Sequence, residues 1–408
     1  MSEPVDITIP TVVIVGAGLG GLILGAILES ANISYHILER ASELRSLAKP
    51  DPSTGYEPLI TARPRLYDIL RRQVPAHKIS MGKKVSRTKE HDNKVTVYCS
   101  DNTEYECSIL VGADGAYSAV RQNIYKKLEE EGSLPLVDKE AFSIGYITMV
   151  GVSKPTNPEK YPQLAEKDRC HFRVVIGDNS DSCYVVTAPD NQISWGIQIQ
   201  IPENESKDLH FWNSEWGPES IDEMLNQFQD FPCAFGGSMK EVFDSTPRDL
   251  ISKVFLEEKV FQTWYNGRSV LIGDACHKLL PGAGQGAMTA MKDAVVLANC
   301  IYNMKDLSDE SIKTAFASYY KQRYLEAVNI TKLSARYTKV MFGHTWSDWL
   351  VRKVILNFLP GWIKMKTAQE AFMNRPQINW LPLTKSRGSG RILPQEGRDE
   401  AEKKARAI

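Results

Sequence analysis

Apolar residues near the start of the chain form two continuous runs that a glycine-rich turn separates. Residues 11–15 read TVVIV, a β-branched run typical of a strand that is buried on both faces. The turn GAGLGG at residues 16–21 is followed by LILGAILESA, which predicts a buried helix. The segment SYHIL at residues 34–38 predicts a second buried strand, which ends at Glu39. A β-turn-α-β unit of about 30 residues is typical of one half of a dinucleotide-binding fold.

Farther along the chain the period of the apolar pattern changes twice. Residues 63–70 predict a helix, residues 79–111 alternating strands, and residues 117–131 another helix. From about residue 142 to residue 262, apolar and polar residues alternate in segments that Pro, Asn, Asp and Gly clusters separate, which predicts an antiparallel sheet. The buried-strand pattern returns at residues 269–272, and a long helix is predicted from Gln285 to about Leu333. The chain is therefore expected to leave its first domain, build a sheet and return.

Composition and charge narrow the class of protein. Hydrophobic residues make up 42% and charged residues 24% of the 408 positions, as in an ordinary globular protein. The net charge of −1 offers no bulk basic field for a nucleic acid, so we expect no nucleic-acid partner. The seven cysteines are odd in number and show no CxxC spacing, which favours a reducing, cytoplasmic setting. The seven histidines show no metal-binding motif, so no metal site is expected.

One stretch of 22 residues, from Ile7 to Leu28, carries no charge and is longer than the segment that usually indicates a membrane helix. The glycines of the turn argue against a continuous spanning helix, and a buried strand and helix explain the missing charge. The N-terminus has no basic region followed by an apolar run and a cleavage site, so no secretory signal is expected.

The turn has the spacing Gly16-x-Gly18-x-x-Gly21, and each glycine has a physical rationale. The first makes the tight turn, the second lets the backbone approach a pyrophosphate, and the third allows the helix to pack closely on the strand. The positive end of the helix dipole attracts the phosphate charge. Glu39 lies 18 residues after Gly21, where a carboxylate can accept hydrogen bonds from a ribose. A glycine-rich turn alone is weak evidence, but strand, helix and acid together favour dinucleotide binding.

Two further segments carry chemistry: LVGADGAYSAVR at residues 110–121 and GRSVLIGDACHKLLPGAGQGAMTAMKDA at residues 267–294. With these three ordered motifs the chain resembles the FAD-dependent aromatic-hydroxylase (group A) family of flavoprotein monooxygenases. It is most similar to the fungal members that epoxidise prenylated and meroterpenoid substrates. The resemblance covers most of residues 11–340.

The resemblance implies an α/β fold in which a Rossmann-like FAD-binding domain of the p-hydroxybenzoate hydroxylase type carries an inserted antiparallel sheet. On that basis we expect the first part of the FAD-binding domain at residues 8–140 and the substrate domain at residues 141–262. The expected continuation is a return segment with a long helix at 263–335 and a C-terminal helical region at 336–384. Residues 385–408 are charged and contain few large apolar residues, so we expect a disordered tail there.

The resemblance also assigns cofactor-binding residues. Glu39 would bind the adenosine ribose, and Asp114 with Arg121 belongs to a motif associated with both FAD and NAD(P)H. Asp274 would bind ribitol or ribose hydroxyls. The other implied cofactor-binding positions are Gly16, Gly18, Gly21, Arg40, Arg63, Pro281, Gly284, Gln285, Gly286 and Ala287.

Other polar residues have simpler interpretations. His277 and Cys276 are expected to be structural, because a lone histidine is more often scaffold than general base and no hydrolase signature surrounds either residue. In the predicted antiparallel sheet, Tyr184, Trp195 and Gln198 are candidates to face the substrate. Strands of period 2 bury half of their residues, so core packing is the better expectation for any one of them.

The resemblance implies a reaction in which NAD(P)H reduces FAD, O₂ adds to form a C4a-hydroperoxide, and the distal oxygen passes to an apolar aromatic or isoprenoid molecule. Two alternatives remain open: a shortened, catalytically impaired FAD-binding relative, and a flavin-dependent reductase or dehydrogenase. The impaired relative is considered because only 22 residues separate Arg40 from Arg63, where relatives carry a longer segment beside the FAD. The gap is either a real shortening or an exon missing from the gene model.

The segment 341–365 contains three tryptophans within an apolar run that Arg352, Lys353 and Pro360 interrupt, so it does not read as a membrane span. Two interpretations are equally open. It forms an interfacial helix that associates peripherally with a membrane, or an amphipathic helix packed on the FAD-binding domain.

Overall fold

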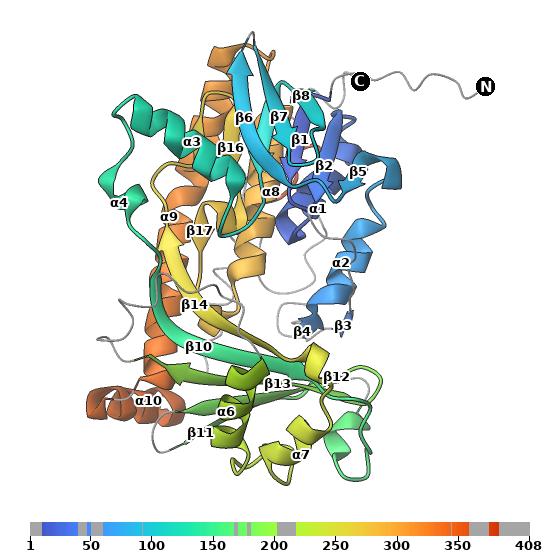
Figure 1. Ribbon diagram of the computed structural model, residues 1–408, viewed down its shortest axis with the longest axis vertical. Coiled ribbons are helices and arrows are strands. Elements are labelled where there is room, and N and C mark those ends of the chain that lie inside the picture. The colour runs from blue at the N-terminus through green and yellow to red at the C-terminus, as the bar shows by residue number, and fades with distance from the viewer. Residues whose placement is uncertain are drawn as a thin grey trace, which may run out of the picture.

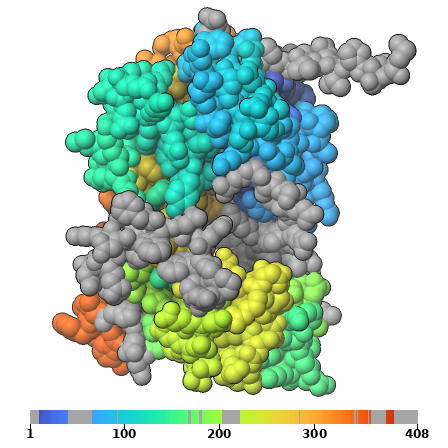
Figure 2. Space-filling view, viewed as in Figure 1, coloured from blue at the N-terminus to red at the C-terminus, as the bar shows by residue number. Residues whose placement is uncertain are grey.

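The structure is a computed structural model of the chain. It describes residues 10–39, 47–49, 60–91, 93–166, 170–177, 181–201, 218–343, 345–358 and 375–382. Two six-stranded sheets form two layers of the molecule, one above the other in Figure 1, and the helix α9 (Asp309–Phe342) runs along both. The surface shows the same division, with residues of the first third of the chain in the upper part and residues near 220–260 in the lower part (Figure 2).

The upper sheet contains five parallel strands and one antiparallel edge strand. Its strands are, in spatial order, β15 (Tyr265–Asn266), β16 (Ser269–Leu271), β9 (Ile109–Gly112), β1 (Val12–Val15), β2 (Tyr35–Glu39) and β5 (Ile79–Met81). The central strands are buried over their whole length, which explains their continuous apolar sequences. A single core joins this sheet to the elements around it.

Helices and a small sheet cover the parallel strands. The helices α1 (Leu19–Ser30) and α8 (Gly286–Tyr302) pack against one another, because a Cβ built on Gly20 would lie 3.5 Å from Cβ of Ala290. The helix α3 (Ala119–Glu130) lies on β9, where Val120 approaches Gly112. The three-stranded sheet consists of β6 (Val85–His91), β7 (Lys94–Cys99) and β8 (Glu104–Cys107), of which β7 and β8 contact β9 and β1.

The lower sheet is antiparallel and carries the second large core on one face. Its strands are, in spatial order, β11 (Phe172–Ile176), β12 (Ser182–Ala188), β13 (Gln192–Gln200), β10 (Ser143–Val152), β14 (Ser252–Val260) and β17 (His277–Lys278). The helices α6 (Pro218–Phe228) and α7 (Met239–Asp244) contribute Phe228 and Phe243 to the core on that face. The remaining described elements are β3 (Leu47–Lys49), β4 (Ile60–Ala62), α2 (Arg63–Arg71), α4 (Leu136–Lys139) and α10 (Trp346–Phe358).

This arrangement confirms the predicted α/β fold with an antiparallel sheet and a helical C-terminal region. One element prediction was wrong. The long helix expected from Gln285 to Leu333 is two helices, because α8 ends at Tyr302 and α9 begins at Asp309, with Ser308 capping its first turn. Among the described helices, none combines the length and hydropathy needed to cross a membrane.

Candidate functional site

The carboxyl ends of the parallel strands bring the predicted motifs to one edge of the upper sheet. Val15 at the end of β1 pairs with Leu38 of β2 and with Gly112 of β9, and Gly112 pairs with Leu271 of β16. The glycine turn, Glu39, the Asp114 segment and the Asp274 segment directly follow these paired residues. Motifs as far apart as residues 16 and 274 therefore meet at the edge where open α/β sheets bind ligands.

The glycine turn is built so tightly that two of its positions exclude a side chain. Gly16 has a φ of +99°, and a Cβ there would lie 2.4 Å from the carbonyl oxygen of Ala113. A Cβ on Gly21 would lie 2.0 Å from the carbonyl oxygen of Gly16, so this glycine lets α1 pack on the turn. Around Gly18, the nearest atoms to a Cβ would be 3.9 Å away, which leaves the backbone open to a ligand.

The N-terminus of α1 fits an anionic group. Gly18 occupies its N-cap position, no side chain caps it, and its first turn holds no acidic residue. The amide groups that begin a helix then need an acceptor, and the helix dipole favours a negatively charged one. Glu39 lies beside the turn, where its carboxylate accepts a hydrogen bond from the backbone N–H of Ala17 at 2.6 Å. A phosphate at the helix and a ribose at Glu39 match this arrangement.

Asp114 caps the helix that follows β9. Its carboxylate accepts hydrogen bonds from the Ser118 hydroxyl at 2.5 Å and from the backbone N–H of Ala119 at 2.7 Å. Burial raises the pKa of this carboxyl, and the hydrogen bonds to Ser118 and to the start of α3 oppose that change. Asp114 thus holds the β9–α3 turn in shape.

Arg121 is buried and joins two of the motifs. Its guanidinium donates to the carbonyl oxygens of Ala275, at 2.8 Å, and Ala116, at 2.5 Å, and lies 4.1 Å from the ring centroid of Phe261. In the structure, this arginine therefore fixes the segment next to Asp274 relative to the Asp114 turn.

The Asp274 segment leads to a second helix start. Asp274 pairs with Lys278 at 2.7 Å. A single 3-10 turn at Pro281–Ala283 ends at Gly284, whose φ of +61° favours glycine, and Gln285 occupies the N-cap position of α8. No side chain caps α8, and its first turn, which contains Gly286 and Ala287, holds no acidic residue. Because Ala290 contacts Gly20, the uncapped starts of α1 and α8 lie side by side.

A buried ion network holds the Asp274 segment to α8 and α9. Asp293 accepts hydrogen bonds from His277 Nε2 at 2.5 Å, from Arg323 Nε at 2.8 Å and from the backbone N–H of Gly273 at 3.0 Å. Burial alone would raise the pKa of Asp293, but the charges of His277 and Arg323 lower it to about 2. His277 is thus part of the scaffold, as expected.

Cys276, His277 and Asp293 also bring one potential metal-ligand atom each to within 4.8 Å of one another. The Asp293 oxygens already serve Arg323, His277 and the Gly273 amide. Burial raises the pKa of the Cys276 thiol, which keeps the sulfur protonated. A protonated thiol and a cationic arginine on the carboxylate both oppose a metal ion, so we assign this cluster to the scaffold.

The side chains of two predicted site residues, Arg40 and Arg63, are not described by the structure. Tyr67, which lies near the glycine turn, was not among the residues predicted from the sequence. Arg40 lies outside the described residues, and of Arg63 the structure describes only the backbone, which begins α2. One helical turn after Arg63, the hydroxyl of Tyr67 lies 3.9 Å from the position of a Cβ on Gly18. The i, i+4 spacing from Arg63 is the signal that could have pointed to Tyr67.

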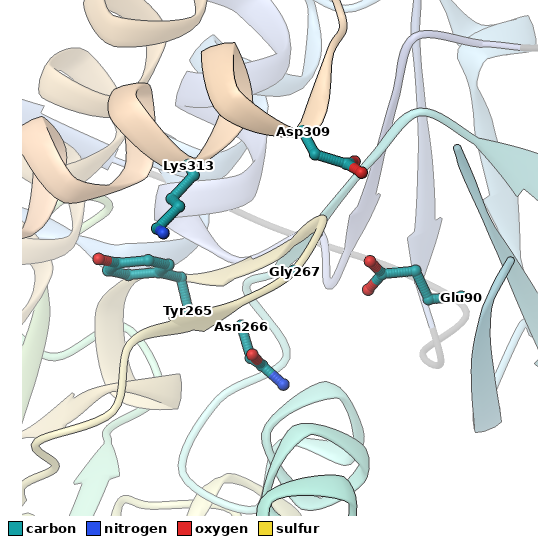
Figure 3. A pocket seen from close by; sticks show the side chains of 6 residues that line it. All are labelled: Glu90, Tyr265, Asn266, Gly267, Asp309 and Lys313. Carbon is teal, nitrogen blue, oxygen red and sulfur yellow. The ribbon is translucent and has the colours of Figure 1, made fainter. Parts of the chain in front are cut away.

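A pocket of about 320 Å³ lies away from the sheet edge that carries the motifs. Figure 3 shows Lys313 and Tyr265 on one side of it and the carboxylates of Asp309 and Glu90 on the other. Gly267 lines this pocket and precedes β16, so it lies at the amino end of the parallel strands, opposite the edge that carries the motifs. Asp309 also pairs with the buried Arg268 at 2.7 Å, so this carboxylate already has a structural partner.

Comparisons with known proteins identify the family of the chain. The model of the FAD binding domain family matches residues 58–334. The FAD-dependent monooxygenase esdpE of Penicillium shearii is 25% identical over 433 residues, covering 91% of this chain and 86% of the relative. The FAD-dependent monooxygenase atmM of Aspergillus flavus is 24% identical over 443 residues, covering 93% and 88%. Both alignments are longer than this chain of 408 residues, so the relatives carry residues that it lacks.

Solved structures share the fold. Klebsiella pneumoniae HpxO complexed with FAD and uric acid gives a TM-score of 0.67 at 18% identity and covers 88% of this chain and 95% of that one. A salicylate hydroxylase substrate complex gives a TM-score of 0.61 at 17% identity and covers 89% and 94%. At these identities the likeness concerns the fold alone.

Proposed function

The chain belongs to the FAD binding domain family, and we propose that it is a monooxygenase that uses bound FAD, NAD(P)H and O₂ to oxidise a small organic molecule. The single observation that carries this proposal is the edge of the parallel sheet. There, two uncapped helix starts lie side by side, next to a glycine turn that closes only without side chains. The names of relatives such as esdpE and atmM support the monooxygenase reaction.

FAD, when bound, would accept a hydride from NAD(P)H and activate O₂. The chain's own residues bind and orient it. The start of α1 would hold the pyrophosphate, and Glu39 would accept hydrogen bonds from the adenosine ribose. Asp274 would bind hydroxyls of the ribityl side. The start of α8, at Gln285 and Gly286, would stabilise negative charge on the ring edge.

Arg121 and Asp293 act on this site through the backbone. Arg121 holds the carbonyl of Ala275, and Asp293 holds the amide of Gly273, so the backbone is fixed one residue before and one residue after Asp274. A backbone segment held in this way needs no reorganisation when the cofactor binds.

The proposal is tested on the purified full chain. We expect yellow protein with a flavin absorption spectrum, or apoprotein that acquires that spectrum with added FAD. We also expect NAD(P)H oxidation and O₂ consumption that rise when an organic substrate is present. Protein that remains colourless with excess FAD would refute the proposal. Bound FAD without substrate-stimulated NAD(P)H oxidation across a broad panel would favour the impaired relative that the short stretch after Arg40 suggests.

We propose further that α10 is the segment through which the protein associates with membranes. Six large apolar side chains recur along this helix and are exposed: Trp346, Trp349, Leu350, Val351, Val354 and Phe358. Trp346 is 78% and Phe358 75% exposed, and the Lys353 ammonium lies 4.7 Å from the Trp349 ring centroid. Tryptophan beside a cation on one apolar stripe is typical of a helix that lies in a membrane interface.

Vesicle sedimentation tests this association. The full chain should pellet with vesicles of phosphatidylcholine and phosphatidylserine, and the variant W346E/W349E should stay in solution. Leu136→Glu is the matched control, because Leu136 is 80% exposed on α4, outside this stripe. Equal pelleting of both variants, or none for the unmodified chain, would exclude α10 as the membrane contact.

A further inference from the structure

The two faces of the antiparallel sheet have different surroundings. Trp195 and Ile197 of β13 belong to the core with α6 and α7, so they lie on one face. Strand alternation then places Gly196, Gln198 and Gln200 on the other face. We call this second face the amide face. It is defined by Tyr146 and Thr148 of β10, Tyr184 of β12, Gln198 and Gln200 of β13, and Leu256 of β14.

Cross-strand pairs fix the membership of this face. Gln200 pairs with Tyr146, and Gln198 pairs with Thr148, so these side chains project to the same side. Tyr146 also pairs with Leu256. A Cβ on Gly196 would lie 2.3 Å from the ring of Tyr184, which therefore covers the same side. Of the three candidates named from the sequence, Tyr184 and Gln198 lie on the amide face and Trp195 lies in the opposite core.

The amide face is directed toward the proposed flavin loop. Leu280, which directly precedes the 3-10 turn and the start of α8, packs in one apolar cluster with Tyr146 and Leu256. Gln200 of β13 pairs directly with Tyr146 of β10, and their backbones lie about 5 Å apart. In Figure 1 the strands β10 and β14 lie between the rest of the lower sheet and the upper layer. The two glutamines thus border the region between this sheet and the loop.

Both glutamines carry buried polar atoms without a hydrogen-bond partner among the described residues. Gln198 is 7% exposed, and its Nε2 has no acceptor. Gln200 Oε1 is also buried and has no donor. Glu258 lies two positions after Leu256 on β14 and therefore projects to the same side of that strand. Its Oε2 is also buried and has no partner among the described residues. Native proteins leave few such atoms, because each costs the full desolvation of a polar group. Several on one face call for a ligand that completes them.

We infer that Gln198 and Gln200 determine substrate specificity by donating a hydrogen bond to, and accepting one from, oxygen functions on the substrate. Tyr146, Leu256 and Leu280 form a buried apolar cluster beside the amides. The substrate class is therefore an oxygenated apolar molecule that carries a hydrogen-bond acceptor and a hydroxyl donor, and a plain hydrocarbon is disfavoured. This inference rests on the proposed function and narrows its substrate.

The first test needs no substrate. Gln198→Leu and Gln200→Leu each remove one buried polar atom that has no partner among the described residues, so each variant of the full chain should melt higher than the unmodified protein, by roughly 2 °C. Gln163→Leu should melt higher as well, because Gln163 also has a buried oxygen without a partner among the described residues. Gln163 lies in the turn Pro162–Leu164, whose Leu164 belongs to the opposite core, so this variant is the matched control for substrate recognition. A lower melting temperature for Q198L and Q200L would show that the protein itself satisfies these amides, and would overturn the inference.

The second test measures recognition. Terpenoid alcohols and ketones are each compared with the parent hydrocarbon, by substrate-stimulated NAD(P)H oxidation and by the change that they cause in the flavin spectrum. The unmodified protein should prefer the oxygenated member. Q198L and Q200L should raise its KM about three- to tenfold, the effect of one neutral hydrogen bond, with Q163L unchanged.

The two proposals fail in different ways. An equal KM for Q198L, Q200L and the unmodified enzyme, or an equal response to alcohol and hydrocarbon, would refute the inference while flavin turnover stands. Protein that binds no FAD would refute the proposed function, and the melting temperatures would still decide whether the amides are unsatisfied.

Discussion

Replacing Gly21 with alanine adds one methyl group at the most crowded point of the glycine turn. The new Cβ would lie 2.0 Å from the carbonyl oxygen of Gly16 and 3.3 Å from Cγ2 of Ile14. Relief requires α1 and the turn to separate by more than about 1 Å, and crowding of this kind typically costs about 1–3 kcal/mol. Alanine has a more favourable helix propensity than glycine by about 1 kcal/mol, which offsets part of this cost. The net loss of folding stability is therefore expected to reach up to about 2 kcal/mol.

The same displacement acts on cofactor binding. The start of α1 and the Ala17 amide, which donates to Glu39, both move with the turn. We therefore expect Gly21→Ala to weaken FAD binding about tenfold or more, which corresponds to about 1.4 kcal/mol. The assay is the ratio of flavin to protein absorbance after dialysis, combined with the melting temperature with and without added FAD.

The neighbouring residue supplies the control. A Cβ on Gly20 would meet Cβ and the carbonyl oxygen of Ala290 and Cδ1 of Ile272, each at 3.5 Å, which is ordinary contact. Gly20→Ala lies in the same helix and gains the same propensity, so it should leave stability unchanged or raise it by up to about 1 kcal/mol. Equal stability and equal FAD retention for G21A and G20A would refute the close packing of helix and turn.

Three further predictions concern the elements around the site. Arg121→Met should lower the melting temperature and increase FAD loss on dialysis, because two charged hydrogen bonds worth about 3 kcal/mol together disappear. The difference in folding stability between Asp293→Asn and the unmodified protein should be largest near neutral pH. The depressed pKa of Asp293 stabilises the fold above the unfolded value near 4, and this contribution fades as the pH falls toward 2, so thermal melts from pH 7 to pH 3 should show the two proteins converging. Gly282→Ala should destabilise the protein, because its Cβ would lie 2.1 Å from Oγ1 of Thr338, and adding Thr338→Ala should restore part of the melting temperature.

The sequence allowed the elements of the upper sheet to be predicted well, because strands buried on both faces leave long apolar runs. The TVVIV run became β1, and the glycine spacing with Glu39 located the turn. Periodicity alone did not reveal the end of α8 at Tyr302, since apolar residues continue on both sides of the break.

The contacts that hold the site together could not be predicted from local patterns. Asp293 and Arg323 lie 30 residues apart on different helices, and Arg121 reaches a carbonyl 154 residues away. Such pairs depend on how helices cross, which no short window of sequence records. The same holds for Gln198, whose buried amide nitrogen has no partner among the described residues, a feature that is visible only when the face opposite Trp195 is known.

The central claim is that the chain inserts an atom of O₂ into an organic substrate at the edge where the three motifs meet. Mass spectrometry of the product formed under ¹⁸O₂, with NAD(P)H, FAD and an oxygenated terpenoid substrate, tests it most directly. The account predicts one ¹⁸O atom in each product molecule, and loss of that product when dialysed Gly21→Ala protein is assayed without added FAD. Substrate-stimulated NAD(P)H oxidation that yields a product without ¹⁸O would contradict it and indicate a flavin-dependent reductase or dehydrogenase.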